Sequence, residues 1–276
     1  MLSVSELCIY PIKGGRGLSV PEAQVERRGL TADRRWMLID DEGRFLSQRG
    51  HPKLALLTVT RTAHGLRVHA PGRSPLDIAT PGADAARRPV VIWDDVVDAP
   101  LASEAAQAWF SAWLEQSVQL CHMDTKAHRP VDPDYALRPD DSVSFADGYP
   151  LLLTSEASLG ELNTRIEAGP VPTPVPMDRF RPNVVIAGSE QPFEEDTWLE
   201  VQMGDVLFTI VKPCARCVVT TIDQQTGVQG KEPLRTLNTF RRAGRKVLFG
   251  MNLIPSRAGT LRVGDPVTVK RRRVRG

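Results

Sequence analysis

The sequence has few cysteines, few aromatic residues and no long apolar run. Four cysteines in 276 residues are too few for the disulfide framework of a small secreted protein. No stretch approaches the ~20 apolar residues of a membrane-spanning helix, and residues 1–6 do not resemble a signal peptide. The formal net charge of +2 indicates neither nucleic acid nor membrane as a partner. We therefore expect a cytoplasmic protein, and we interpret the basic run 270–275 as a solvated terminus.

Short apolar segments separated by turns predict a mainly β protein with a few helices. The 22 prolines and 21 glycines are spread along the chain and separate many short segments. Short strands at this spacing are typical of a barrel or a sandwich. Apolar residues at helical spacing predict helices over 103–116, 156–168 and 232–242. Strands are expected at 7–10, 37–40, 45–49, 54–60, 65–69, 76–78, 90–93, 118–122, 151–153, 206–210, 247–254 and 261–269.

The segment 125–142 is rich in proline, aspartate and arginine and has little apolar content. Loops of this length without regular structure are uncommon inside a compact domain and are often functional. We interpret the segment as a connection between two domains, 1–122 and 123–276.

Two thiols lie three residues apart in the stretch 212–217, directly after a predicted strand. We expect the pair where this strand ends and another, 218–221, begins. A zinc site needs about four Cys or His ligands, and Cys8 and Cys121 are isolated, so zinc is disfavoured. A dithiol redox motif normally opens a helix, whereas 218–221 is β-branched and a poor helix former. A c-type haem site would need a histidine where Val218 stands.

Two interpretations of the cysteine pair remain open from the residues alone. Lys212 and Arg216 lie nearby and would favour a thiolate, and a thiolate is a suitable ligand for a soft or redox-active metal. The pair could equally be two buried structural cysteines.

The segment 11–17 is a glycine-rich loop that carries Lys13 and Arg16. Glycines allow backbone N–H groups to turn toward an anion, and the two cations supply charge. The spacing is not that of a P-loop, and a flexible hairpin loop is the alternative.

Two further polar stretches lie next to predicted strands. Pro182 fixes its own φ and favours an extended geometry for Arg181, so that Arg181 and Asn183 could hold a planar polar ligand. In an alternating strand, Arg34 and Trp36 would share one face.

Three motifs together are more specific than any one of them: Tyr10-Pro11-Ile12-Lys13, Arg181-Pro182-Asn183, and Pro213-Cys214-Ala215-Arg216-Cys217 followed by Thr220-Thr221-Ile222-Asp223. Their order and spacing resemble the MOSC family, named for the C-terminal domain of molybdenum-cofactor sulfurase. More closely, the chain resembles the branch that joins an N-terminal MOSC β-barrel domain to a MOSC domain. That branch includes the mitochondrial amidoxime-reducing component and bacterial reductases of N-hydroxylated bases. The resemblance covers nearly the whole chain and implies two β-barrel domains.

The resemblance also implies a site. Cys217 matches the molybdenum ligand, and Asp147 lies in a segment that borders the metal, which implies a role in handling protons. The residues implied to bind the molybdenum cofactor, a molybdopterin, are Lys13, Gly14, Arg34, Arg181, Asn183 and Cys217. Gly14 stands where mitochondrial relatives carry a hydroxyl residue. Any side-chain hydrogen bond made there is lost, and only the backbone N–H of Gly14 remains as a donor. Gly148 and Tyr149 replace small hydroxyl residues, so we expect a different pocket shape and substrate choice.

The activity implied by the resemblance is that of a molybdenum-dependent oxidoreductase. It would reduce small N-hydroxylated or N-oxygenated compounds with two electrons and two protons, and release water. Beside Cys217 the sequence has too few cysteines for the four thiolates of an iron–sulfur cluster, and the chain ends soon after Val269. We therefore expect a separate electron-donor protein of the ferredoxin, flavodoxin or cytochrome b5 type, with its reductase. The alternatives are a cofactor carrier or a sulfur-transfer protein with a persulfide on Cys217, and a non-catalytic thiol protein.

Overall fold

The computed structural model describes residues 1–273, so Val274 and Arg275 of the predicted basic terminus lie outside the described residues. The strands of the N-terminal half are β1 (Ser3–Ile9), β2 (Leu18–Ser19), β3 (Glu22–Glu26), β4 (Gly29–Leu30), β5 (Trp36–Ile39), β6 (Thr58–Thr62), β7 (Gly65–His69), β8 (Leu76–Ala79), β9 (Arg87–Ile92), β10 (Asp95–Pro100) and β11 (Gln119–His122). Those of the C-terminal half are β12 (Leu151–Ser155), β13 (Val184–Ala187), β14 (Trp198–Met203), β15 (Val206–Arg216), β16 (Arg242–Ala243), β17 (Lys246–Pro255), β18 (Gly259–Arg262) and β19 (Val267–Arg272).

Helices are few in the described part of the chain. The α-helices are α1 (Glu104–Leu114), α2 (Glu156–Glu167) and α3 (Leu234–Phe240), and the 3₁₀ helices are η1 (Pro52–Leu56), η2 (Met177–Phe180), η3 (Glu194–Thr197) and η4 (Val218–Thr221). The predicted mainly β class is therefore confirmed. None of these helices is both long enough and apolar enough to span a bilayer, as far as residues 1–273 show.

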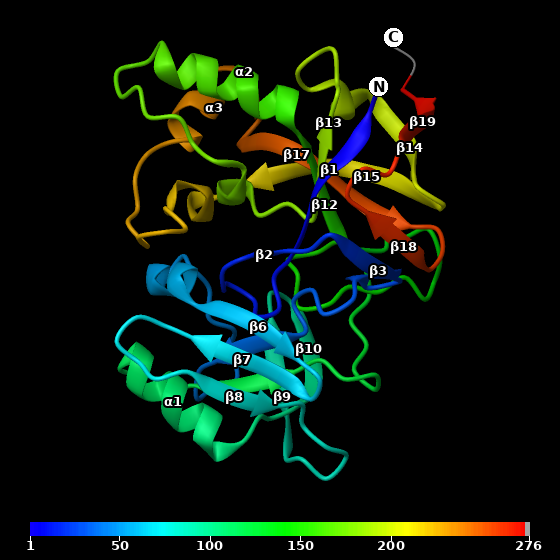
Figure 1. Ribbon diagram of the computed structural model, residues 1–276. Coiled ribbons are helices and arrows are strands. Elements are labelled where there is room, and N and C mark those ends of the chain that lie inside the picture. The colour runs from blue at the N-terminus through cyan, green and yellow to red at the C-terminus, as the bar shows by residue number, and fades with distance from the viewer. Residues whose placement is uncertain (274–276) are drawn as a thin grey trace.

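A nine-stranded sheet dominates the C-terminal half of the described chain. Its order is β19-β14-β15-β17-β12-β13-β1-β2, with β16 paired to β17. Because β1 pairs with β13 and β3 pairs with β18, N-terminal strands join C-terminal ones. Figure 1 shows this sheet with α2 and α3 at one end of the molecule, and β6 to β10 with α1 at the other. The strand orders are open paths, so the sheets within residues 1–273 are not closed into the expected barrels. The domain boundary at 122/123 stays a prediction.

The predicted helix 103–116 is observed as α1. The Ser103 side chain accepts a hydrogen bond from the Ala106 N–H, as expected for a helix N-cap. Trp109, Phe110 and Trp113 are buried against the N-terminal sheets, so this aromatic face forms part of a hydrophobic core.

The strand predicted at 54–60 starts as a 3₁₀ helix, and the strand predicted at 218–221 is a 3₁₀ helix throughout. Residues 52–56 form η1 before β6 begins at Thr58, because Pro52 has the fixed φ that favours the first turn of a helix. The segment 218–221 forms η4. Its Thr220 and Thr221 hydroxyls donate to the carbonyls of Cys217 and Val218 at 3.0 and 2.7 Å, and these local bonds override β propensity.

A buried carboxylate lies at the start of α2. Ser155 caps this helix by accepting the Ser158 N–H at 3.1 Å. Glu195 is fully buried beside both serines, and it accepts the Ser158 hydroxyl at 2.6 Å and the Ser155 hydroxyl at 3.0 Å. Burial raises the pKa of Glu195 above its ordinary value of 4.5, although these hydrogen bonds oppose the shift.

We expect the Glu195→Gln variant to gain stability relative to the wild type as pH rises above about 4.5. In the folded wild type, Glu195 keeps its proton up to a higher pH than it does in the unfolded chain. Protonated Glu195 therefore stabilises the folded wild type fully below the unfolded-state pKa, and this stabilisation is lost as pH rises through the folded-state pKa. Urea unfolding between acidic and neutral pH would measure the difference. Glu190→Gln, at an exposed position, is the control, and a difference for Glu195→Gln that does not change with pH would contradict the prediction.

Candidate functional site

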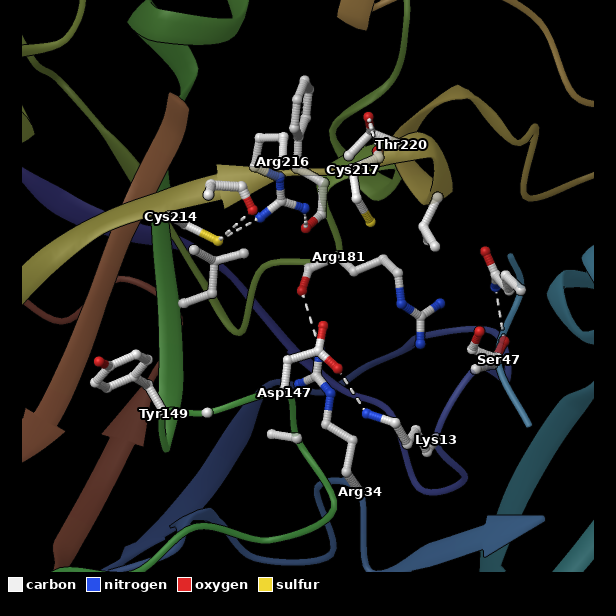
Figure 2. A pocket seen from close by; sticks show the side chains of 18 of the residues that line it. Lys13, Arg34, Ser47, Asp147, Tyr149, Arg181, Cys214, Arg216, Cys217 and Thr220 are labelled. Carbon is white, nitrogen blue, oxygen red and sulfur yellow. Dashed lines mark hydrogen bonds and ion pairs between the residues drawn. The ribbon is translucent and has the colours of Figure 1, made fainter. Parts of the chain in front are cut away.

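One cavity brings together residues from both halves of the chain. It has an empty volume of about 910 Å³ including its solvent-open mouth. Its lining includes all seven residues selected from the sequence, namely Lys13, Gly14, Arg34, Asp147, Arg181, Asn183 and Cys217. Most of them are shown in Figure 2. Their roles remain predictions.

Lys13 is held in the loop after β1. Its backbone N–H donates to the Trp36 carbonyl at 2.7 Å, and its buried ammonium donates to the Phe145 carbonyl at 2.9 Å and to Asp147 Oδ1 at 2.6 Å. Burial lowers the pKa of Lys13, and the facing Asp147 carboxylate opposes that shift. Gly14 follows with φ of +82°, a left-handed geometry that favours glycine.

Arg34 is anchored by an acidic residue that the sequence analysis did not select. Its guanidinium donates to Asp33 Oδ1 and Oδ2 at 2.9 and 2.7 Å. Asp33 is fully buried and also accepts the Tyr10 N–H at 2.8 Å. Burial alone would lower the pKa of Arg34, but Asp33 raises it above its ordinary value. The expected alternating strand is wrong at Arg34, which has a left-handed φ of 47° in a turn before β5 begins at Trp36.

Arg181 also has a left-handed conformation, with φ 55° and ψ 46°. The extended geometry expected before Pro182 is therefore wrong, because Arg181 ends η2 and its N–H donates to the Asp178 carbonyl at 3.1 Å. Its guanidinium donates to Gln224 Oε1 at 3.2 Å and lies 4.3 Å from the Tyr10 ring centroid. Burial lowers the pKa of Arg181 to about 10, and it pairs with no carboxylate among residues 1–273.

Asn183 uses its amide within the protein. Its Oδ1 accepts hydrogen bonds from Arg34 and from the Leu152 N–H, each at 3.2 Å, and its Nδ2 donates to the Cys8 carbonyl at 3.1 Å. Asn183 therefore ties β12 to the end of β1 and orients Arg34 toward the cavity.

The two motif cysteines have different surroundings. Cys214 Sγ accepts a hydrogen bond from Arg216 at 2.9 Å, whereas Cys217 Sγ accepts one from Arg49 at 3.4 Å. In Figure 2 the two sulfurs lie apart, with the Arg216 guanidinium between them. Lys212, expected near the thiols, instead lies 4.2 Å from the Tyr135 ring centroid.

Arg49 was not selected from the sequence. It ends the predicted strand 45–49 but lies in a turn in the structure, and nothing in the local sequence distinguishes it from a solvated arginine. Its guanidinium lies 4.6 Å from the ring centroid of Trp93, which occupies a left-handed turn between β9 and β10 with φ of 55°. The N-terminal half thus supplies the side chain that contacts Cys217.

Asp147 faces the cavity, with 72% of its side chain exposed. Desolvation within the cavity would raise the pKa of Asp147. The cations of Lys13, Arg34 and Arg49 outweigh this effect and hold the pKa of Asp147 well below its usual range. In this arrangement of charges Asp147 is a carboxylate at neutral pH, and therefore a hydrogen-bond acceptor.

The cavity carries an excess of positive charge. Its lining holds the cations of Lys13, Arg34, Arg49, Arg181 and Arg216 against the single carboxylate of Asp147, while Asp33 neutralises Arg34 from behind. Convergent cations of this kind suit an anionic ligand. No group of three His, Cys, Asp or Glu side chains in the described residues has the arrangement of a metal site, so a metal at Cys217 would need most of its ligands from a cofactor.

Comparison with known proteins identifies two matching segments. Residues 1–117 match the MOSC N-terminal beta barrel domain, and residues 140–268 match the MOSC domain. The chain is 37% identical to mitochondrial amidoxime reducing component 2 of Rattus norvegicus and 35% identical to mitochondrial amidoxime-reducing component 1 of Homo sapiens. Each alignment covers 96% of this chain and 82% of the relative. Among solved structures, the YUAD protein from Bacillus subtilis aligns over 97% of this chain and 94% of its own, at 10% identity and a TM-score of 0.40.

Proposed function

The chain belongs to the family that joins a MOSC N-terminal beta barrel domain to a MOSC domain and that includes the mitochondrial amidoxime-reducing components, and from this premise we propose a specific activity. The protein binds the molybdenum cofactor and reduces small N-hydroxylated or N-oxygenated compounds with electrons from an external donor. The observation that carries this proposal is the convergence of the Cys217 thiol with an excess of cations in one cavity.

The residues present fit such a cofactor. Cys217 supplies one soft ligand, and the pterin dithiolene would complete the coordination that the protein side chains do not. The buried Lys13 and the half-buried Arg181 are cations that would bind the anionic end of the pterin, together with Arg34, which Asp33 and Asn183 orient. When bound, the cofactor supplies the two-electron chemistry, and the protein supplies binding, orientation and charge.

The pair of Lys13 and Asp147 is suited to moving protons into the cavity. Reduction of an N–OH group consumes two protons. Lys13 Nζ holds a proton against Asp147 Oδ1 at 2.6 Å, and burial lowers the pKa of Lys13. An anion bound beside Lys13 would raise the pKa of Asp147, so that this carboxyl could hold a proton nearer neutral pH.

The substrate would enter through a groove that continues from the cavity past Trp93, Gly148 and Tyr149. Apart from its two chain neighbours, no residue has an atom within 4 Å of a Cβ placed on Gly148, so this position borders open space in the groove. Asp94 and Asp132 line the groove, are exposed, and form no ion pair within residues 1–273. These two free carboxylates outnumber Lys212, the cation of the groove lining that forms no ion pair within the described residues. The excess of negative charge favours a basic substrate, such as an N-hydroxylated amidine or guanidine.

The proposal is tested on protein purified from cells that make the molybdenum cofactor. We expect equimolar molybdenum and molybdopterin, and dithionite-driven conversion of an N-hydroxylated amidine to the parent amidine. Protein from cells that cannot make the cofactor is the control and should show neither. Loaded protein that fails to turn over the substrate but transfers cofactor or labelled sulfur to an acceptor would instead support a carrier or sulfur-transfer protein.

A further inference from the structure

The hairpin between β16 and β17 concentrates positive charge at the surface. The segment Arg241–Lys246 carries four cations in six residues. Arg241 is neutralised by Asp196 at 2.6 Å. Arg242, Arg245 and Lys246 are exposed, and within residues 1–273 none of these three forms an ion pair with a carboxylate. We call Arg242, Arg245 and Lys246 the cationic hairpin.

The cationic hairpin adjoins the strand that leads into the proposed metal ligand. Val247 of β17 is opposite Arg242 of β16 on one side and opposite Arg216 of β15 on the other. Neighbouring strands lie about 4.8 Å apart, and Cys217 follows Arg216 at the end of β15. Because Arg216 pairs with Val247 in an antiparallel ladder, Lys246, the residue before Val247, lies level with Cys217, the residue after Arg216. Figure 1 shows β17 beginning beside the end of β15, close to α3.

The fold itself does not account for these three charges. Arg242 makes one side-chain hydrogen bond, to the Gly244 carbonyl within the same turn at 2.9 Å. Like charges crowded into a short turn repel one another, and the whole chain has a formal charge of only +2, so the cluster is a local feature. Exposed cations on an edge strand can also prevent unwanted strand pairing. A test must distinguish this explanation from a binding role of the same cations.

We propose that the cationic hairpin is the docking surface for an acidic redox protein that supplies the electrons. This inference rests on the proposed function. Two donor molecules each deliver one electron and are each oxidised by one electron. With two protons, these two electrons break the N–O bond of the substrate, form an N–H bond and release water. Electron transfer weakens steeply with distance, so a donor must dock near Cys217. A positive patch attracts an acidic surface and steers its approach.

The test compares two triple charge reversals that change net charge equally. The first is Arg242→Glu, Arg245→Glu and Lys246→Glu. The matched control is Arg61→Glu, Arg73→Glu and Lys126→Glu, three exposed cations of the N-terminal half that form no ion pair within the described residues. The probes are an acidic [2Fe–2S] ferredoxin, a flavodoxin and a cytochrome b5, each with its reductase.

We expect the hairpin variant to raise the KM for the donor protein by ~10-fold or more at low ionic strength, as expected for lost electrostatic steering, and to weaken binding of the oxidised donor in titrations. Dithionite-driven turnover should remain that of the wild type. The control variant should keep the wild-type KM for the donor.

Three results would overturn the docking surface: an unchanged donor KM and affinity in the hairpin variant, an equal change in the control, or no turnover of the wild type with any of the three donors while dithionite still drives it. Failure of the proposed function would look different, because the wild type would then show no dithionite-driven turnover.

Discussion

Replacing Cys217 with alanine is expected to remove bound molybdenum and N-reduction together. Cys217 is the proposed soft ligand at the cation-rich cavity, whose lining also includes Cys214, and the described residues offer no cluster of other metal-binding side chains. We expect dithionite-driven activity to fall by more than ~100-fold, beyond the 10- to 100-fold typical for losing a residue outside the metal's own ligands. Molybdenum content of the purified variant, measured together with the rate, tests both effects.

Cys214→Ala is the matched control because it removes the other thiol of the same motif. The Cys214 sulfur accepts its hydrogen bond from Arg216 and not from Arg49, so we expect this variant to keep its molybdenum and most of its activity. A Cys217→Ala protein that retained both metal and turnover would refute the ligand role. Equal losses in the two variants would show instead that the motif acts as a structural unit.

The sequence was informative where its motifs resemble those of a known family. That resemblance implied Cys217 as a metal ligand and Lys13, Arg34 and Arg181 as cofactor-binding cations, and the structure places all four around one cavity. The mainly β class followed from short segments and frequent turns, and it is confirmed by the strand content.

Residues that act through tertiary contacts could not be found in the same way. Arg49 contacts Cys217 across 168 residues of sequence, and no local pattern encodes that approach. Propensity also failed where local bonds or packing compete with it. Thr220 and Thr221 close a 3₁₀ turn with their own hydroxyls, and Arg181 takes a left-handed turn before a proline because it ends η2 over the Tyr10 ring.

Replacing Asp33 with alanine is expected to lower the free energy of unfolding by about 3–5 kcal/mol, the cost of breaking a buried ion pair. Asp33 is fully buried, and the Arg34 side chain is only 13% exposed. The variant would leave a buried guanidinium without its carboxylate and the Tyr10 N–H without its acceptor at 2.8 Å. Guanidinium chloride unfolding monitored by tryptophan fluorescence would measure the loss.

Two further variants separate charge from hydrogen bonding in that prediction. Asp33→Asn keeps an oxygen for the Tyr10 N–H but removes the charge facing Arg34, so its loss should be intermediate. Asp77→Ala breaks a bidentate pair with Arg67 at the surface, where solvent screens the charges, so its loss should be far smaller. Equal losses for Asp33→Ala and Asp77→Ala would contradict the argument. The pair matters for function because Asp33 ties the guanidinium of Arg34, which lines the cavity, to the Tyr10 backbone.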